Sequence, residues 1–130
     1  MAKRKQVQKN KYFYWCTEKF GRKAYWHKSN WRAHLKHETI LNYEQIYIDT
    51  LIDPDRVFPS YDKSCYYKID AFKGISFGIK KHAKVVVVEN PNYKPAPTKE
   101  RYVIVASAMD TDVIPEEGKV PPKFVKERKK

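Results

Sequence analysis

The chain has 130 residues and a formal net charge of +12, which is enough length for one modest hydrophobic core. It contains no run of 18 apolar residues and no signal-peptide pattern at its start, so we expect a cytoplasmic protein without a membrane span. Cys16 and Cys65 are too few for a disulfide framework. Aromatic residues make up 15% of the chain, which argues against a disordered protein.

The positive charge is concentrated at the two ends. Residues 1–11 carry five Lys/Arg and no acid, and residues 119–130 carry six Lys/Arg and one acid. We therefore expect a basic N-terminal arm over 1–11, one domain over 12–112, and a proline-containing basic tail over 113–130. Such tails either attach loosely to phosphate backbones or simply keep a protein in solution.

Charge is also segregated within the predicted domain. Residues 38–62 hold six acids against one basic residue, and residues 63–84 hold six lysines against one acid. This block pattern predicts one acidic and one basic surface, and the basic surface is a plausible site for a polyanion.

The first predicted elements are two short aromatic strands, over 11–16 and 22–26, with a turn between them. They predict a β-hairpin. A short helix is expected next, with Ser29 or Asn30 as its N-cap.

A second predicted helix begins at Asn42 and ends at Asp53-Pro54, because a residue before proline is displaced from the helical region. The run Val85–Val88 predicts a strand buried on both faces, with 102–106 as its neighbour. Helices followed by a meander predict an α+β fold, with N-terminal helices packed on a four- to five-stranded antiparallel sheet and basic disordered tails. The expected strands cover 64–72, 75–80, 84–89 and 101–109.

The order of several short segments resembles that of a known family. Trp31–Glu38 is similar to a Trp-x-x-His helix start, and it is followed by a helix ending in Thr50–Val57, by Tyr66–Lys68, by Val85–Val88 and by Val103–Ala108. The succession, over residues 25–110, resembles the phage-type nuclease domains of the barnase–EndoU–colicin–RelE (BECR) superfamily. Their shared core is one or two helices followed by a four-stranded antiparallel sheet.

This resemblance implies a metal-independent endoribonuclease of phage or toxin type. In such enzymes the ribose 2′-hydroxyl attacks the adjacent phosphorus, which leaves a 2′,3′-cyclic phosphate and a free 5′-hydroxyl. The expected partners are RNA, tRNA included, and an antitoxin or immunity protein, and no cofactor is expected. The reaction needs a base, an acid and cations near the phosphate.

Three residues are the predicted catalytic set. An imidazole is the side chain that serves as acid or base near neutral pH, so His34 would carry the proton transfers. Lys68 would neutralise the scissile phosphate, and Ser107 would hydrogen-bond a phosphate oxygen. Each has an ordinary alternative: a core histidine beside Trp31 and Leu35, a solvated strand lysine, and a structural serine at a strand end.

A wider group of residues is predicted to contact RNA, either through charge or through stacking on a base. His37 also has a simpler interpretation, as a solvated histidine at the end of the first predicted helix. The basic residues of the turn before Val85 have one too, as a polar turn. The predicted RNA-binding residues are Arg32, His37, Arg56, Tyr66, Lys80, Lys81, His82 and Lys84.

A metal site is the weaker interpretation of the N-terminal half. Cys16, His27, His34 and His37 fall within 22 residues, and zinc prefers such ligands. However, no Cys-x-x-Cys pair is present, so no metal site is predicted.

Three functions therefore remain open from the sequence. The first is the ribonuclease. The second is a non-catalytic nucleic-acid-binding module. The third is a protein-binding inhibitor or assembly factor that uses the aromatic hairpin and the acidic segment 38–62.

Overall fold

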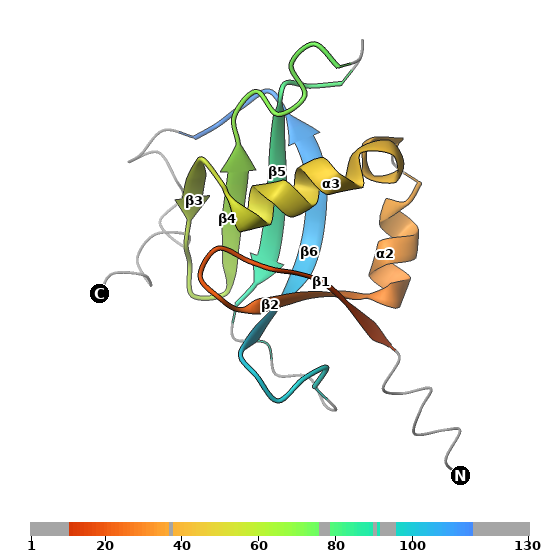
Figure 1. Cartoon of the computed structure of the whole chain (residues 1–130), viewed down its shortest axis with the longest axis vertical. Helices are drawn as coiled ribbons and strands as arrows, with labels where there is room; N and C mark the ends of the chain where they lie inside the picture. The colour runs from red at the N-terminus through yellow and green to blue at the C-terminus, as the bar shows by residue number, and fades with distance from the viewer. Residues whose placement is uncertain (1–10, 37, 76–78, 90, 92–95, 116–130) are drawn as a thin grey trace.

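A computed structural model describes residues 11–36, 38–75, 79–89, 91 and 96–115. Eight elements follow one another along these residues (Figure 1). Most of the predicted basic arm and tail lies outside them. The elements are β1 (Tyr12–Thr17), β2 (Lys23–His27), α2 (Lys28–His34), α3 (Glu38–Ile52), β3 (Arg56–Phe58), β4 (Lys63–Lys68), β5 (His82–Val88) and β6 (Tyr102–Thr111).

The predicted aromatic hairpin is confirmed as β1 and β2. Tyr12 pairs with His27 and Tyr14 pairs with Tyr25 in an antiparallel ladder. Gly21 closes the connecting turn with a φ of +90°, a left-handed conformation that a side chain would strain. Its backbone N–H donates to the Glu18 carbonyl oxygen at 2.9 Å.

The hairpin belongs to the main sheet, and this makes the predicted antiparallel α+β architecture wrong. The strands form one six-stranded sheet in the order β1-β2-β6-β5-β4-β3. β2 pairs with β6 in parallel, through Lys23 with Tyr102 and Tyr25 with Ile104, and every other neighbouring pair is antiparallel. The sheet is therefore mixed, and the two short helices follow a hairpin instead of opening the fold.

Both helices lie on one face of the sheet. α3 crosses in front of β4, β5 and β6, and α2 lies beside β2 and β6 (Figure 1). α2 begins after His27, whose ring nitrogen accepts from the backbone N–H of Ser29, so the predicted cap is displaced by two to three residues. The backbone of α3 departs from helical geometry at Tyr43, next to the predicted start at Asn42.

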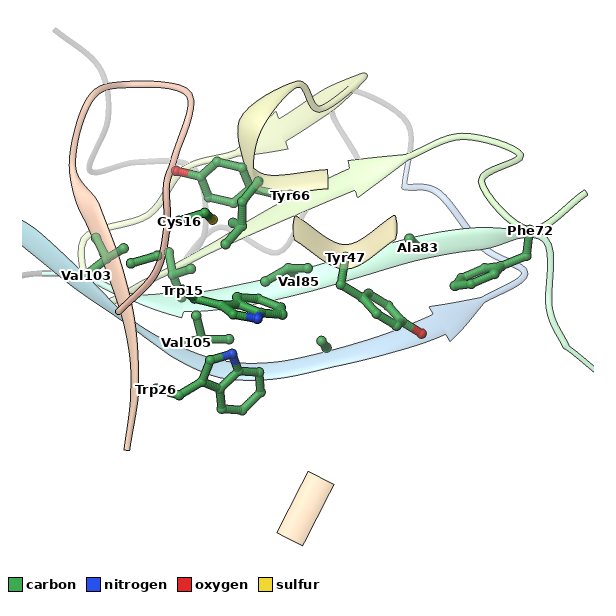
Figure 2. Close-up of a cluster of buried hydrophobic side chains, with 14 residues drawn as sticks. Trp15, Cys16, Trp26, Tyr47, Tyr66, Phe72, Ala83, Val85, Val103 and Val105 are labelled. Atoms are coloured by element: carbon green, nitrogen blue, oxygen red, sulfur yellow. The ribbon is translucent and has the colours of Figure 1, made fainter. Parts of the chain in front are cut away.

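The hydrophobic core lies between the helices and the sheet. α3 contributes the fully buried Tyr47 and Leu51 to this core. The Tyr47 side chain points toward the central strands that carry Val85 and Val105 (Figure 2). Nearer to α2, the Trp26 ring meets the rings of Trp15 and Trp31 edge-to-face at 5.3 and 5.1 Å.

The central strand β5 is buried on alternate residues, and the prediction of burial on both faces is wrong. Val85 and Val87 have no exposed surface and face α3, whereas Val86 and Val88 point to the opposite face and are half-buried. This opposite face carries no helix among the described residues (Figure 1). We call it the helix-free face.

The remaining strand predictions differ at their ends. β4 ends at Lys68, and the chain turns from Ile69 to Ile75 where a longer strand was expected. Part of the predicted strand 75–80 lies outside the described residues. In the portion of the chain that the structure covers, none of the helices has the length and apolar character needed to cross a membrane.

Candidate functional site

The helix-free face combines aromatic and basic side chains. Strand register assigns its members, since directly paired residues point to the same face. At these strand positions there is no Asp or Glu. The members include Tyr12, Tyr14, Lys23, Tyr25, His27, Arg56, Phe58, Lys63, Tyr67, His82, Lys84, Tyr102, Ser107 and Met109.

Three tyrosines from three neighbouring strands form a continuous series on this face. The rings of Tyr14 and Tyr25 lie 5.8 Å apart, and those of Tyr25 and Tyr102 lie 6.3 Å apart, both edge-to-face. Tyr14 is 49% exposed, and the other two are partly exposed. The Lys23 ammonium lies 5.3 Å from the Tyr14 ring centre. We call Tyr14, Tyr25 and Tyr102 the tyrosine series.

A second aromatic group lies across the sheet on β3, β4 and β5. Phe58 contacts Tyr67 edge-to-face at 5.6 Å, and the Lys84 ammonium lies 5.8 Å from the Tyr67 ring centre. Burial raises the pKa of Tyr67 to about 12, with a further contribution from Cys65, so this hydroxyl is not an acid–base group near neutral pH. The group is less accessible than the tyrosine series, because Tyr67 is almost completely buried.

A buried ionic network lies near the β1–β2 turn. The Arg22 guanidinium donates from Nε to Glu18 at 2.8 Å, from Nη1 and Nη2 to Glu89, and from Nη2 to the Tyr66 hydroxyl at 3.2 Å. Tyr66 in turn donates to Glu18 at 2.6 Å, and Ser64 donates to Glu89 at 2.6 Å. The network joins the turn to β4 and to the end of β5.

Competing effects set the pKa values in this network. Burial favours neutral Glu18, but hydrogen bonds from Arg22, Tyr66 and backbone amides outweigh burial and lower the pKa of this carboxyl. Burial also opposes the charge on Arg22, yet bonds to Glu89 and Glu18 raise its pKa. Burial and the bond to Glu18 raise the pKa of Tyr66. At neutral pH Glu18 is thus a carboxylate and Arg22 a cation.

The three predicted catalytic residues do not converge. The His34 ring lies 5.1 Å from Trp26 beside β2, and its Nδ1–H donates to the Asn30 carbonyl at 3.0 Å. Lys68 ends β4, two strands beyond β6, and donates to the Asp53 carbonyl at 2.7 Å. Ser107 pairs with Val86 and so belongs to the helix-free face, opposite both. As placed here, these side chains cannot act on one phosphate.

Four of the predicted residues do share a face. By register, Arg56, His82, Lys84 and Ser107 all belong to the helix-free face. His82 lies at its end, where its Nδ1 accepts from the Asp70 backbone N–H at 2.9 Å.

The other predicted RNA-binding residues lie elsewhere. Tyr66 requires a correction, because it has no exposed surface and points into the core, so it cannot stack on a base. Arg32 is exposed on α2. Lys80 and Lys81 are exposed in a turn whose backbone N–H groups donate to carboxylates of Asp110 and Asp112. His37 lies outside the described residues.

The considered zinc ligands are not gathered either. Cys16 is in the core, whereas His27 is on the helix-free face and bonds to Ser29. Among the described residues, no three His, Cys, Asp or Glu side chains form a group able to hold a metal ion. Burial, followed by the charge of Glu18, raises the pKa of the Cys16 thiol to about 12, which keeps it protonated.

The residues that sequence reasoning missed are Tyr14, Tyr25 and Tyr102. Their alternation with buried neighbours such as Ala24, Trp26 and Val103 was a usable signal, because period-two burial places them on one face. What the sequence lacked was the pairing of β2 with β6, which brings Tyr102 beside Tyr25.

The fold and this face define an open mixed-sheet domain with helices on one side and an aromatic, basic surface on the other. In comparisons with known proteins, no family model, no curated protein and no solved structure matches the chain. The resemblance to BECR nucleases therefore stays a prediction.

Proposed function

We propose that this chain is a non-catalytic module that binds single-stranded nucleic acid on the helix-free face. The observation that carries the proposal is the tyrosine series with Lys23 beside it. The ammonium of Lys23 also pairs with the exposed Glu100 at 3.5 Å, but the strands themselves present no carboxylate to that face.

The chemistry of the face matches that of an unpaired strand. Every base has a π-face that stacks on an aromatic ring, and lysine ammonium groups attract the phosphates between bases. The three rings come from adjacent strands, which lie about 4.8 Å apart, so successive bases can contact successive rings. A duplex hides its bases within its own stack and gains nothing from these rings.

Binding is supported better than cleavage by the placement of the polar groups. Phosphodiester cleavage needs its acid, base and cation within reach of one phosphate. His34, Lys68 and Ser107 lie in separate surroundings, and Lys68 already bonds to Asp53.

A binding measurement tests the proposal. Fluorescence anisotropy would follow a labelled oligonucleotide of about 10 nucleotides, a length that one small domain can cover, as single-stranded RNA, single-stranded DNA and duplex. Salt of about 0.2 M suppresses loose attachment of the basic tails. The single strands should bind more tightly than the duplex.

Variants of the tyrosine series sharpen this test. Tyr14→Leu and Tyr25→Leu should each weaken single-strand binding roughly fivefold or more, since stacking contributes about 1–3 kcal/mol per base. Phe20→Leu is the matched control: Phe20 is 47% exposed but lies in the turn beside Tyr66, away from the face. Equal affinity of all three variants and the wild type would refute the proposal, as would preferred binding of duplex.

A further inference from the structure

A pocket of about 410 Å³ opens where β5 ends and β6 begins. Its size lies within the range of about 300–1,000 Å³ that holds small ligands in proteins. Its lining includes Arg22 and Glu89 from the buried network, Lys99 and Arg101 before β6, and Tyr102. No predicted site residue lies in it.

Two residues of the buried network, Arg22 and Glu89, form one wall of the pocket. Arg22 and Glu89 are 8% and 5% exposed and bind each other through two hydrogen bonds. Within the described residues, four hydrogen bonds use four of the five N–H groups of the guanidinium. The pocket thus has a polar wall, and one guanidinium N–H of Arg22 has no partner among the described residues.

The rim of the pocket carries two available cations. Glu100 also lines the pocket, but its carboxylate forms an ion pair with Lys23 at 3.5 Å. Lys99 and Arg101, on either side of Glu100, are exposed and form no ion pair with any described residue. Two cations beside an arginine N–H favour an anionic group, and phosphate is the anion that arginine and lysine bind well.

Tyr102 connects the pocket with the tyrosine series. Tyr102 lines the pocket, and its ring contacts the Tyr25 ring edge-to-face. A strand whose bases lie over Tyr14 and Tyr25 therefore meets the pocket at the next ring along the sheet. Tyr102 is thus shared by the pocket and the tyrosine series.

We propose that this pocket binds one nucleotide, with its base against Tyr102 and its phosphate between Lys99 and Arg101. The inference rests on the proposed function, which it deepens by naming a subsite. The shared chemistry, a heteroaromatic ring with a phosphate, belongs both to a free mononucleotide and to the terminal nucleotide of a strand.

Titrations of the full chain test the subsite. AMP, adenosine and inorganic phosphate would be titrated while ¹H–¹⁵N NMR follows the backbone amides, and an oligonucleotide would be compared with and without a terminal phosphate. AMP should bind more tightly than adenosine or phosphate alone, with the largest shifts at Arg22 and Tyr102. A preference for the end-phosphorylated oligonucleotide assigns the pocket to a strand end, and AMP binding without that preference assigns it to a free nucleotide.

Two double variants that remove the same charge distinguish AMP binding in the pocket from general attraction to a basic protein. Lys99→Gln/Arg101→Gln should weaken AMP binding roughly tenfold or more, since each bond to a charged group is lost. Lys36→Gln/Lys73→Gln removes the same charge from two exposed positions that do not line the pocket and should leave AMP binding unchanged.

The two proposals fail in different ways. Equal AMP affinity of both double variants, or no AMP binding at all, overturns the pocket, and the proposed function stands if Tyr14→Leu still weakens oligonucleotide binding. The opposite result is AMP binding that depends on Lys99 and Arg101, with an oligonucleotide affinity that Tyr14→Leu does not change. That result refutes strand binding on the helix-free face and leaves the pocket as a site for a mononucleotide.

Discussion

Replacing Arg22 by methionine should destabilise the fold strongly and in a pH-dependent way. The substitution keeps an unbranched side chain but removes the cation between Glu18 and Glu89, which are only 2% and 5% exposed. Removing one partner of a buried ion pair costs about 3–5 kcal/mol. For a domain of this size this corresponds to a fall in Tm of roughly 15–35 °C.

The pH dependence has a definite sign. In the wild type the pKa of Glu18 is lowered, so its stabilisation is complete above its ordinary value of 4.5 and is lost as pH falls through the lower folded pKa. Without Arg22, burial dominates and raises the pKa of Glu18 in the folded state, so the protein takes up a proton at Glu18 when it folds. The deficit of the variant should therefore be largest at pH 7 and smaller at pH 4.

Thermal and urea unfolding, followed by circular dichroism at both pH values, measure this deficit. Arg32→Met is the control, because Arg32 is exposed on α2 and should change stability by less than about 0.5 kcal/mol. Arg22→Lys keeps the positive charge but lacks the planar guanidinium with its several N–H donors. Its loss of stability should be intermediate, and it can be measured if the methionine variant does not fold. A deficit that is equal at both pH values, or no larger than that of Arg32→Met, would contradict the reasoning.

Three further predictions concern the core and the chemistry. Trp15→Phe should cost roughly 1.5–3 kcal/mol more than Trp26→Phe in urea unfolding, because the Trp15 indole donates to a carboxylate at 2.7 Å whereas the Trp26 indole N–H has no acceptor among the described residues; equal costs would argue against that bond. Val85→Ala should cost roughly 2–3 kcal/mol and Val86→Ala about 1 kcal/mol, since only Val85 is fully buried; the reverse order would invert the assigned faces. Total RNA incubated with the protein and EDTA should remain full-length on a gel, and cyclic-phosphate fragments that disappear in His34→Ala would restore the ribonuclease hypothesis.

Local patterns in the sequence were sufficient for much of the secondary structure. Alternating aromatic residues on either side of a glycine turn predicted the hairpin of β1 and β2, and Asp53-Pro54 marked the end of α3. The pairing of β5 with β6 also followed from two apolar runs. Each of these features depends on residues that are close in the chain or on a simple period of burial.

The candidate site was only partly accessible from the sequence. Arg56, Lys84 and Ser107 were chosen for their charge or hydroxyl, and the fold does place them on one face. Tyr66 was wrongly predicted to contact RNA. Tyr66 and Tyr67 are adjacent and point to opposite faces, and period-two alternation alone allows either of them to point inward. The contact with Phe20 and the hydrogen bonds to Glu18 and Arg22 make Tyr66, and not Tyr67, the residue that points into the core.

The sequence by itself determined that the chain is a small basic protein of helices and strands with an aromatic hairpin and segregated charge. Only the tertiary structure decided that β2 lies parallel to β6, although Tyr25 and Tyr102 are far apart in the chain. Strand pairing depends on backbone hydrogen bonds that any side chain permits, so no local pattern specifies a distant partner. That one pairing makes the sheet mixed, completes the tyrosine series and joins it to the pocket at Tyr102.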